Sequence, residues 1–126
     1  MNENSDIDLL VQTVHRALPE AAANADAWLR ERGFDPAQAN PYIWTEALAG
    51  VTNGRIQQRQ REVVQQHLYF FAAQYARGGD AVRQCITAAY LGNLLLGLDD
   101  STKRWTWALF PKTLQAVYVA KWERPF

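Results

Sequence analysis

The side chains best suited to chemistry in this sequence are two histidines, one cysteine and two serines. Neither His15 nor His67 belongs to an HExxH, CxxC or similar arrangement, so no spacing typical of a metal site is present. Ser5 and Ser101 lie near predicted helix starts, where a hydroxyl caps backbone N–H groups. No serine elbow or glycine-rich phosphate loop accompanies the histidines. We therefore expect no catalytic residues, no metal, no cofactor and no enzymatic activity.

Three other polar or reactive positions have a structural interpretation beside the chemical one. His67 precedes Leu68 near an apolar helix face, where a histidine is more often a hydrogen-bonded core or boundary group than a base. Cys85 has apolar neighbours and no second cysteine to pair with, which favours a small core residue over a reactive thiol. The pair Asp99-Asp100 suits the positive end of a following helix.

The charges are distributed unevenly although the net charge is zero. Residues 1–50 have a net charge of −5 and residues 51–126 a net charge of +5. The two halves either attract each other across the fold or leave an acidic face for a basic partner, because opposite potentials steer association. In the second half, Arg55 and Arg59 lie in the segment RIQQRQREVVQQ, which resembles a solvated helix face more than a phosphate-binding one. We expect no nucleic-acid partner.

The aromatic residues are numerous for one small core, with five each of Trp, Tyr and Phe. Trp105 and Trp107 are two positions apart, which separates them by about 200° on a helix, and Tyr42 and Trp44 have the same spacing. One member of each pair is either an exposed anchor for a partner or is covered by another helix. Our candidate partner-binding residues are these tryptophans and acidic residues of the first half: Trp44, Trp105, Trp107, Asp26, Glu31, Asp35 and Glu46.

Helical periodicity dominates the chain, and no strand signal of comparable length is present. Apolar residues recur at spacings of three and four between Ile7 and Leu18, which predicts a helix from about Asp6 to Ala17. Pro19 suits the first turn of a second helix, which is expected to end at Gly33.

Further along, Pro36 and Pro41 make the segment FDPAQANP a connection. A short helix over 42–51 is expected to lead into a turn at Asn53-Gly54. Beyond that turn, apolar residues from Ile56 to Tyr75 predict one face of a long helix that ends at a Gly-Gly pair.

The segment CITAAYLGNLLLGL, residues 85–98, is apolar nearly all the way round a helix, with Thr87 and Asn93 as its polar members. A helix without a polar face has to be packed on all sides by other parts of the protein. We therefore expect a helix over about 80–98 to be the centre of the fold, with the Asn93 amide buried and tying helices together.

These observations predict an all-α fold in which residues 1–126 form a single compact domain of six or seven helices around that central helix. The longest apolar run is too short to span a membrane, so no membrane partner is expected. The start of the chain, MNENSDID, is acidic and lacks the apolar stretch of a secretory signal, which predicts a cytoplasmic location.

A Gly-Asp turn, the string Y-L-G-N-L at residues 90–94 and the string L-F-P-K-T-L at 109–114 together resemble a family of small all-helical bacterial cytoplasmic proteins. Some of those proteins are immunity proteins that act beside secreted toxins. The likeness covers roughly Glu46 to Trp122. Gly92 stands where the family tends to have an acidic residue, so any role of that acid is absent here.

The resemblance implies a non-catalytic protein that binds and neutralises a cognate bacterial toxin. Two other functions stay open from the sequence. One is a helical ligand-binding or enzymatic domain with a pocket near Asn93, Tyr90 and His67. The other is a homodimeric structural module that uses exposed aromatic residues.

Overall fold

The structure is a computed structural model that describes the backbone of residues 3–126 and the side chains from Ser5 onward. The described chain is helical and contains no strand, which confirms the predicted all-α fold of one compact domain. Seven α-helices and one π-helical segment follow one another along it: α1 Glu3–Ala17, α2 Pro19–Glu31, α3 Pro41–Gln57, α4 Arg61–Arg77, α5 Asp80–Cys85, the π-helix η1 Ile86–Leu91, α6 Asp100–Trp107 and α7 Lys112–Trp122.

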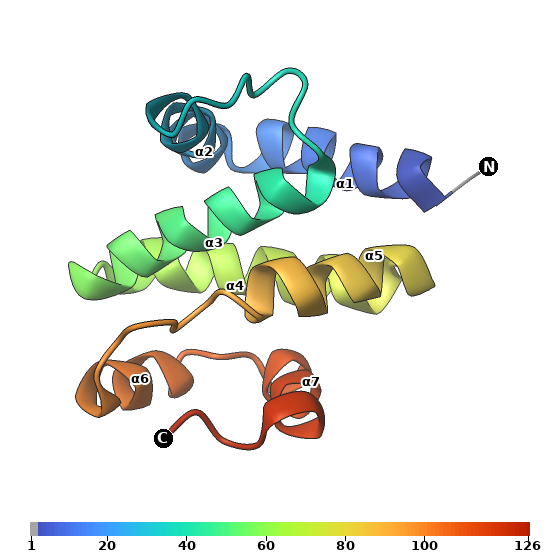
Figure 1. The fold of residues 1–126 in the computed structure, drawn as a ribbon. Coiled ribbons are helices and arrows are strands. Elements are labelled where there is room, and N and C mark those ends of the chain that lie inside the picture. Colours follow the sequence, from blue (N-terminus) through green and yellow to red (C-terminus); the bar gives the residue numbers. More distant parts are fainter. Residues whose placement is uncertain (1–2) are drawn as a thin grey trace.

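The helices form three tiers (Figure 1). In that view α1, α2 and the connection between α2 and α3 are at the top, α3, α4 and α5 cross the middle, and α6 and α7 are at the bottom. Helix α3 packs against α1, α2, α4, η1 and α6, and η1 packs against α3 and α7. The core therefore lies around α3 and η1 together.

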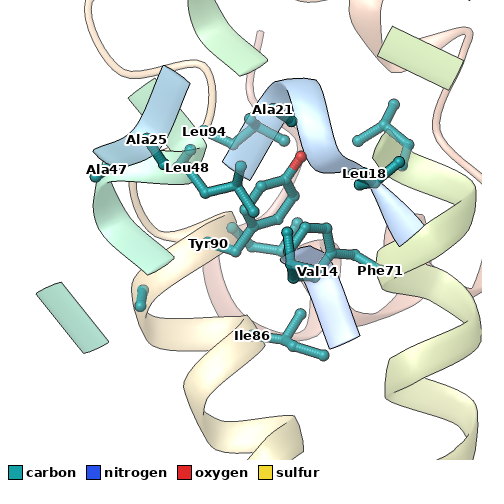
Figure 2. Packing of buried hydrophobic residues seen from close by; sticks show 14 of the residues in the cluster. Val14, Leu18, Ala21, Ala25, Ala47, Leu48, Phe71, Ile86, Tyr90 and Leu94 are labelled. Carbon is teal, nitrogen blue, oxygen red and sulfur yellow. The ribbon is translucent and has the colours of Figure 1, made fainter. Parts of the chain in front are cut away.

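Small residues allow the helices of the upper tiers to approach closely. Ala25 of α2 and Ala47 of α3 are fully buried, and the contact between α2 and α3 is the most extensive in the fold. Below them the ring of Phe71 stacks on the ring of Tyr90 with a centroid distance of 3.8 Å (Figure 2). The hydroxyl of Tyr90 points past this stack toward Ala21 at the start of α2. This core is apolar except for a few hydrogen-bonded side chains.

The predicted turn at Asn53-Gly54 is wrong, because α3 continues through it to Gln57. Thr52 and Ile56 are both fully buried in the last part of α3, so core packing there overrides the turn preference of the dipeptide. The chain reverses only after Gln57, where Arg59 adopts a φ of 56°.

The expectation of one helix over 80–98 is also wrong in part. Helix α5 widens into η1 at Ile86, and the helix ends at Leu91. A series of turns follows, in which Leu95 and Gly97 have φ values of 70° and 77°. This segment is not surrounded, since the Leu96 side chain is 71% exposed. The centre of the fold is formed by α3 and η1 together instead.

The long helix expected from Ile56 begins only at Arg61, because Ile56 belongs to α3. Pro41, which we placed in the connection, begins α3 one residue before the predicted start. Pro19 occupies the predicted first-turn position of α2. Gly33 has a φ of 85° immediately after α2, a conformation that favours glycine. Asp99 caps α6, because its Oδ1 accepts a hydrogen bond from the Thr102 backbone N–H at 2.8 Å.

Candidate functional site

A groove of about 410 Å³ is hollowed into the surface of the described residues. Its walls come from α1, α2, the 32–40 connection and the first turn of α3 (Figure 1). The groove brings together residues that are far apart in the sequence, and its polar and aromatic lining includes Asp8, His15, Asp26, Arg30, Asp35 and Trp44.

Asp26 is held in place on the groove wall by Trp44 and has His15 as a second neighbour. The Trp44 indole Nε1 donates a hydrogen bond to Asp26 Oδ1 at 2.8 Å. His15 Nε2 lies 3.5 Å from Asp26 Oδ2, and its ring packs over the Trp44 ring with a centroid distance of 4.9 Å. His15 Nδ1 is 3.0 Å from the carbonyl of Val11, which fixes Nδ1 as a donor. The carboxylate of Asp26 is therefore pre-oriented before any partner arrives.

The connection after α2 places Asp35 at the mouth of the groove. Asp35 Oδ1 accepts a hydrogen bond from the Ala37 backbone N–H at 3.0 Å, which makes a local turn. Asn40 then caps α3 by accepting from the Tyr42 N–H at 2.8 Å. These side-chain bonds, two prolines and backbone turn bonds from the Gln38 and Ala39 N–H groups order this segment.

The charge of the groove is predominantly negative. Three carboxylates, those of Asp8, Asp26 and Asp35, share it with one guanidinium, that of Arg30. Asp8 and Asp35 are exposed at the surface, whereas Asp26 is half-buried. Such an arrangement attracts a cationic group and offers it carboxylate oxygens.

The structure unites three of the seven candidate partner-binding residues and separates the other four. Trp44, Asp26 and Asp35 line the groove. Glu31 lines a neighbouring hollow beside Trp28, and Glu46 is exposed outside the groove on α3.

None of the three tryptophan candidates is a fully exposed anchor. Trp44 is only 2% exposed, because α1 and α2 cover it, so it serves the groove by positioning Asp26. Trp105 and Trp107 are half-buried on opposite sides of α6. The Arg59 guanidinium lies 5.1 Å from the Trp105 ring, and Trp107 packs against Tyr118 of α7. Covering helices account for much of the aromatic excess.

Our sequence analysis missed Asp8, His15 and Arg30 as groove residues. Asp8 and His15 are seven positions apart and therefore share a face of α1, which is a signal that the sequence contains. No residue pattern indicated that the 32–40 connection would fold back beside that face.

A second polar cluster lies inside the core. Thr52 Oγ1 is 2.9 Å from His67 Nδ1 and 2.8 Å from the Tyr90 hydroxyl. Burial, together with the nearby Arg55 guanidinium, lowers the pKa of His67 to about 4. Burial raises the pKa of Tyr90 above its usual range. His67 is thus a buried, hydrogen-bonded group, as predicted. Thr52 connects His67 to Tyr90, and both of these residues were expected near a pocket.

Asn93 does not have the role that we predicted. Its side chain is half-buried, and its Nδ2 donates to the carbonyl of Ala89, one turn earlier in its own segment. Asn53 ties α3 to the turns after η1 instead: its Nδ2 donates to the Asn93 carbonyl, and its Oδ1 accepts from the Leu95 N–H, each at 2.9 Å. Cys85 is fully buried, in agreement with the prediction, and burial raises its pKa.

A known protein family matches most of the sequence. Residues 11–123 match a family described as a domain of unknown function, DUF7674. The chain belongs to this family. No curated protein and no solved structure shows significant similarity to the chain. The DUF7674 match covers α2 to α7 and the second half of α1, so it includes the His67 cluster and all but one of the polar groove residues named above.

Two further observations concern this DUF7674 domain. Among the described residues, no three His, Cys, Asp or Glu side chains are grouped so that they could hold a metal ion. None of the described helices combines the length and apolar character that a membrane crossing requires.

Proposed function

We propose that this chain is a non-catalytic protein-binding domain that receives a basic segment of its partner in the acidic groove. The observation that carries the proposal is the convergence of Asp8, Asp26 and Asp35 on one groove of about 410 Å³. A lysine or arginine side chain that enters there meets carboxylates on more than one wall, and Arg can donate two parallel hydrogen bonds to one carboxylate.

The resemblance to immunity proteins suggests the class of partner. We propose that the partner is a cognate bacterial toxin, which the chain neutralises in the cytoplasm by covering its active site or another essential surface. An immunity protein has to outcompete a toxin's substrate, so we expect a nanomolar Kd, about −12 kcal/mol. Toxins that act on nucleic acids carry basic active-site surfaces, to which an acidic groove is complementary.

Co-expression tests this function directly. The chain is produced together with the product of the adjacent gene, and both growth and co-purification are measured. We expect the chain to remove toxicity and to co-purify with the toxin. A neighbouring product that stays lethal in the presence of the chain and does not co-purify contradicts the proposal.

Matched variants test the place of binding. Asp8→Asn with Asp35→Asn removes two exposed charges from the groove, and the amide oxygen introduced by Asp35→Asn can still accept the Ala37 N–H. Glu46→Gln removes an exposed charge of the same sign outside the groove. We expect the double variant to lose protection and the Glu46→Gln variant to keep it. Equal protection by both variants contradicts binding in the groove.

A further inference from the structure

A second hollow, of about 210 Å³, lies between the end of α1, the start of α2, and helices α3 and α4. It shares no lining residue with the acidic groove. Among its polar lining side chains, Glu20, Arg55 and Gln66 are exposed or half-buried, whereas His67 of α4 is buried and only 3% exposed. The position of the hydrogen on the His67 ring therefore decides what the buried part of the hollow can bind.

The hydrogen bonds of Thr52 determine which ring nitrogen of His67 carries that hydrogen. Thr52 Oγ1 has one hydrogen, which it donates to the Leu48 carbonyl at 3.2 Å. Its two lone pairs remain for two donors, the Tyr90 hydroxyl at 2.8 Å and His67 Nδ1 at 2.9 Å. The hydrogen of the neutral ring is therefore on Nδ1, and Nε2 is an acceptor.

This acceptor is open to the hollow. The hydrogen bond that His67 makes uses Nδ1, and no group in the described residues donates to Nε2. Every fully enclosed side-chain nitrogen or oxygen atom of the described residues has a hydrogen-bond partner, so Nε2 is not fully enclosed. Since His67 lines the hollow, Nε2 is reached from there. An acceptor on a side chain this deeply buried favours a ligand that brings a donor.

The charges around His67 narrow the class of donor. A carboxylate has only acceptor atoms, which repel the lone pair of Nε2. An ammonium group has donors, but the Arg55 guanidinium is close enough to disfavour a positive charge at His67. The Glu20 carboxylate would attract an ammonium group, yet its side chain is 87% exposed and it already pairs with Arg55 at 3.4 Å. A neutral donor fits these surroundings best.

Donors elsewhere in the lining favour a ligand that carries an acceptor as well. Leu18 occupies the N-cap position of α2 and makes no side-chain capping bond. The backbone N–H groups of Glu20 and Ala21 therefore lack a capping side chain, and both residues line the hollow. A carbonyl oxygen can accept from these groups or from Arg55. A carboxamide combines an N–H donor with a carbonyl acceptor and has no net charge.

We propose that this hollow binds a small neutral carboxamide, whose N–H donates to His67 Nε2 and whose carbonyl oxygen faces the donors of Arg55 and of the first turn of α2. The decisive contact is the one with Nε2, because it is made by a buried atom that has no other partner. This ligand site is separate from the acidic groove, so a partner bound there leaves it unchanged.

NMR of the purified chain at pH 7 tests the proposal with acetamide as the probe and acetate as the matched control, since acetate has the same shape without the donor. Before titration we expect the His67 ring hydrogen on Nδ1. Acetamide is expected to shift the Nε2 signal and the amide signals of Glu20 and Ala21 in a saturable manner, and acetate is expected to leave Nε2 unchanged.

Three results of these spectra overturn the proposal. The first is a ring hydrogen on Nε2. The second is the absence of a saturable shift with acetamide, which would mean that the hollow holds solvent only. The third is binding of acetate as tight as that of acetamide, which would mean that the N–H donor is not recognised.

A pair of surface variants tests the location without disturbing the core. Ala17 is exposed and lines the hollow, whereas Ala23 is exposed and lies outside it. Ala17→Phe is expected to obstruct the hollow and to weaken acetamide binding at least about tenfold, and Ala23→Phe is expected to leave it unchanged. The same affinity in both variants and in the original chain contradicts binding in this hollow.

Glu20→Gln tests whether the ligand is recognised as a neutral group. The substitution removes a mostly exposed charge from the lining. We expect the Kd for acetamide to change by less than about twofold, because an exposed charge contributes little to the binding of a neutral molecule. A change of about tenfold in either direction would contradict recognition through the donor at His67 Nε2.

Discussion

At the scale of single residues, His67 shows how the fold changes a side chain that the sequence presents as ordinary. Burial and the Arg55 guanidinium lower its pKa from 6.5 to about 4, so the imidazole is neutral at pH 7. Thr52 satisfies Nδ1 and connects it to Tyr90 of η1. The cluster thereby joins α3, α4 and η1 through hydrogen bonds inside an apolar core.

This lowered pKa predicts a loss of stability in mild acid. Between pH 6.5 and 4 the unfolded chain binds a proton at His67 that the folded chain does not, so the free energy of unfolding decreases as pH falls. From pH 7 to pH 5 the loss attributable to His67 is about 2 kcal/mol. Urea unfolding at both pH values measures it.

His67→Asn provides the comparison for that experiment. The side-chain amide introduced by this substitution can hydrogen-bond to Thr52 Oγ1 but does not titrate. We expect the variant to lose about 2 kcal/mol less stability between pH 7 and pH 5 than the original chain. The same pH dependence in both proteins would show that His67 is not the group responsible.

At the scale of helices, α3 contains a dipeptide that prefers a turn but is helical because of tertiary packing. Gly54 lies inside α3, its φ is not in the left-handed region, and a Cβ atom added there meets no atom within 4 Å. Gly54→Ala should therefore raise the free energy of unfolding by about 0.5–1 kcal/mol, because alanine has the higher helix propensity. Thermal or urea unfolding measures the change.

Gly33→Ala is the opposite case and serves as the control. Gly33 also has open space around it, but its φ of 85° is strained for alanine, so we expect a loss of about 1 kcal/mol. A destabilised Gly54→Ala variant would favour a turn at that position over the continuous helix.

Asn53 joins α3 to the turns that follow η1. Its two hydrogen bonds satisfy the Asn93 carbonyl and the Leu95 N–H, and they hold Leu95 at a φ of 70°. Asn53→Ala is expected to cost about 1–3 kcal/mol of stability, because both backbone groups lose their partner. Unfolding of Asn93→Ala gives the reference, since that side chain bonds only within its own segment. An equal or larger cost for Asn93→Ala would contradict this assignment.

The helices could be predicted well from the sequence and their lateral packing poorly, for a physical reason. Proline and glycine act locally, so the start of α2 at Pro19 and its end near Gly33 could be predicted. Whether α3 continues past Asn53 depends on the burial of Thr52 and Ile56 by other helices, which the local sequence does not report.

The candidate site shows the same limit. Asp26, Asp35 and Trp44 could be selected from residue type and from the acidic character of the first half. Their meeting in one groove depends on the path of the 32–40 connection, as does the pairing of Asp26 with Trp44. Glu46 has the same charge as the two aspartates and belongs to the same half of the chain, yet it lies outside the groove.

For the molecule as a whole, the two oppositely charged halves are not joined by a network of ion pairs. Among the ion pairs of the described side chains, the one between the halves is Glu20 with Arg55, at 3.4 Å. Most of the acidic charge of the first half therefore stays available at the surface, and part of it converges on the groove. The connection that lines this groove is at the top of Figure 1. This distribution supports a basic partner that docks at that end.

Calorimetry with the purified product of the adjacent gene tests whether the acidic groove binds this partner. The Kd is measured for the original chain, for the double variant Asp8→Asn with Asp35→Asn, and for Glu46→Gln. Each protein is measured at about 0.1 M and about 1 M salt, because the screening length falls from about 10 Å to about 3 Å between these concentrations. We predict that the original chain and Glu46→Gln bind with a nanomolar Kd and that their binding weakens in high salt. The double variant is predicted to bind at least about tenfold more weakly at about 0.1 M salt. The same Kd for all three proteins at both salt concentrations, or no binding at all, would contradict the account.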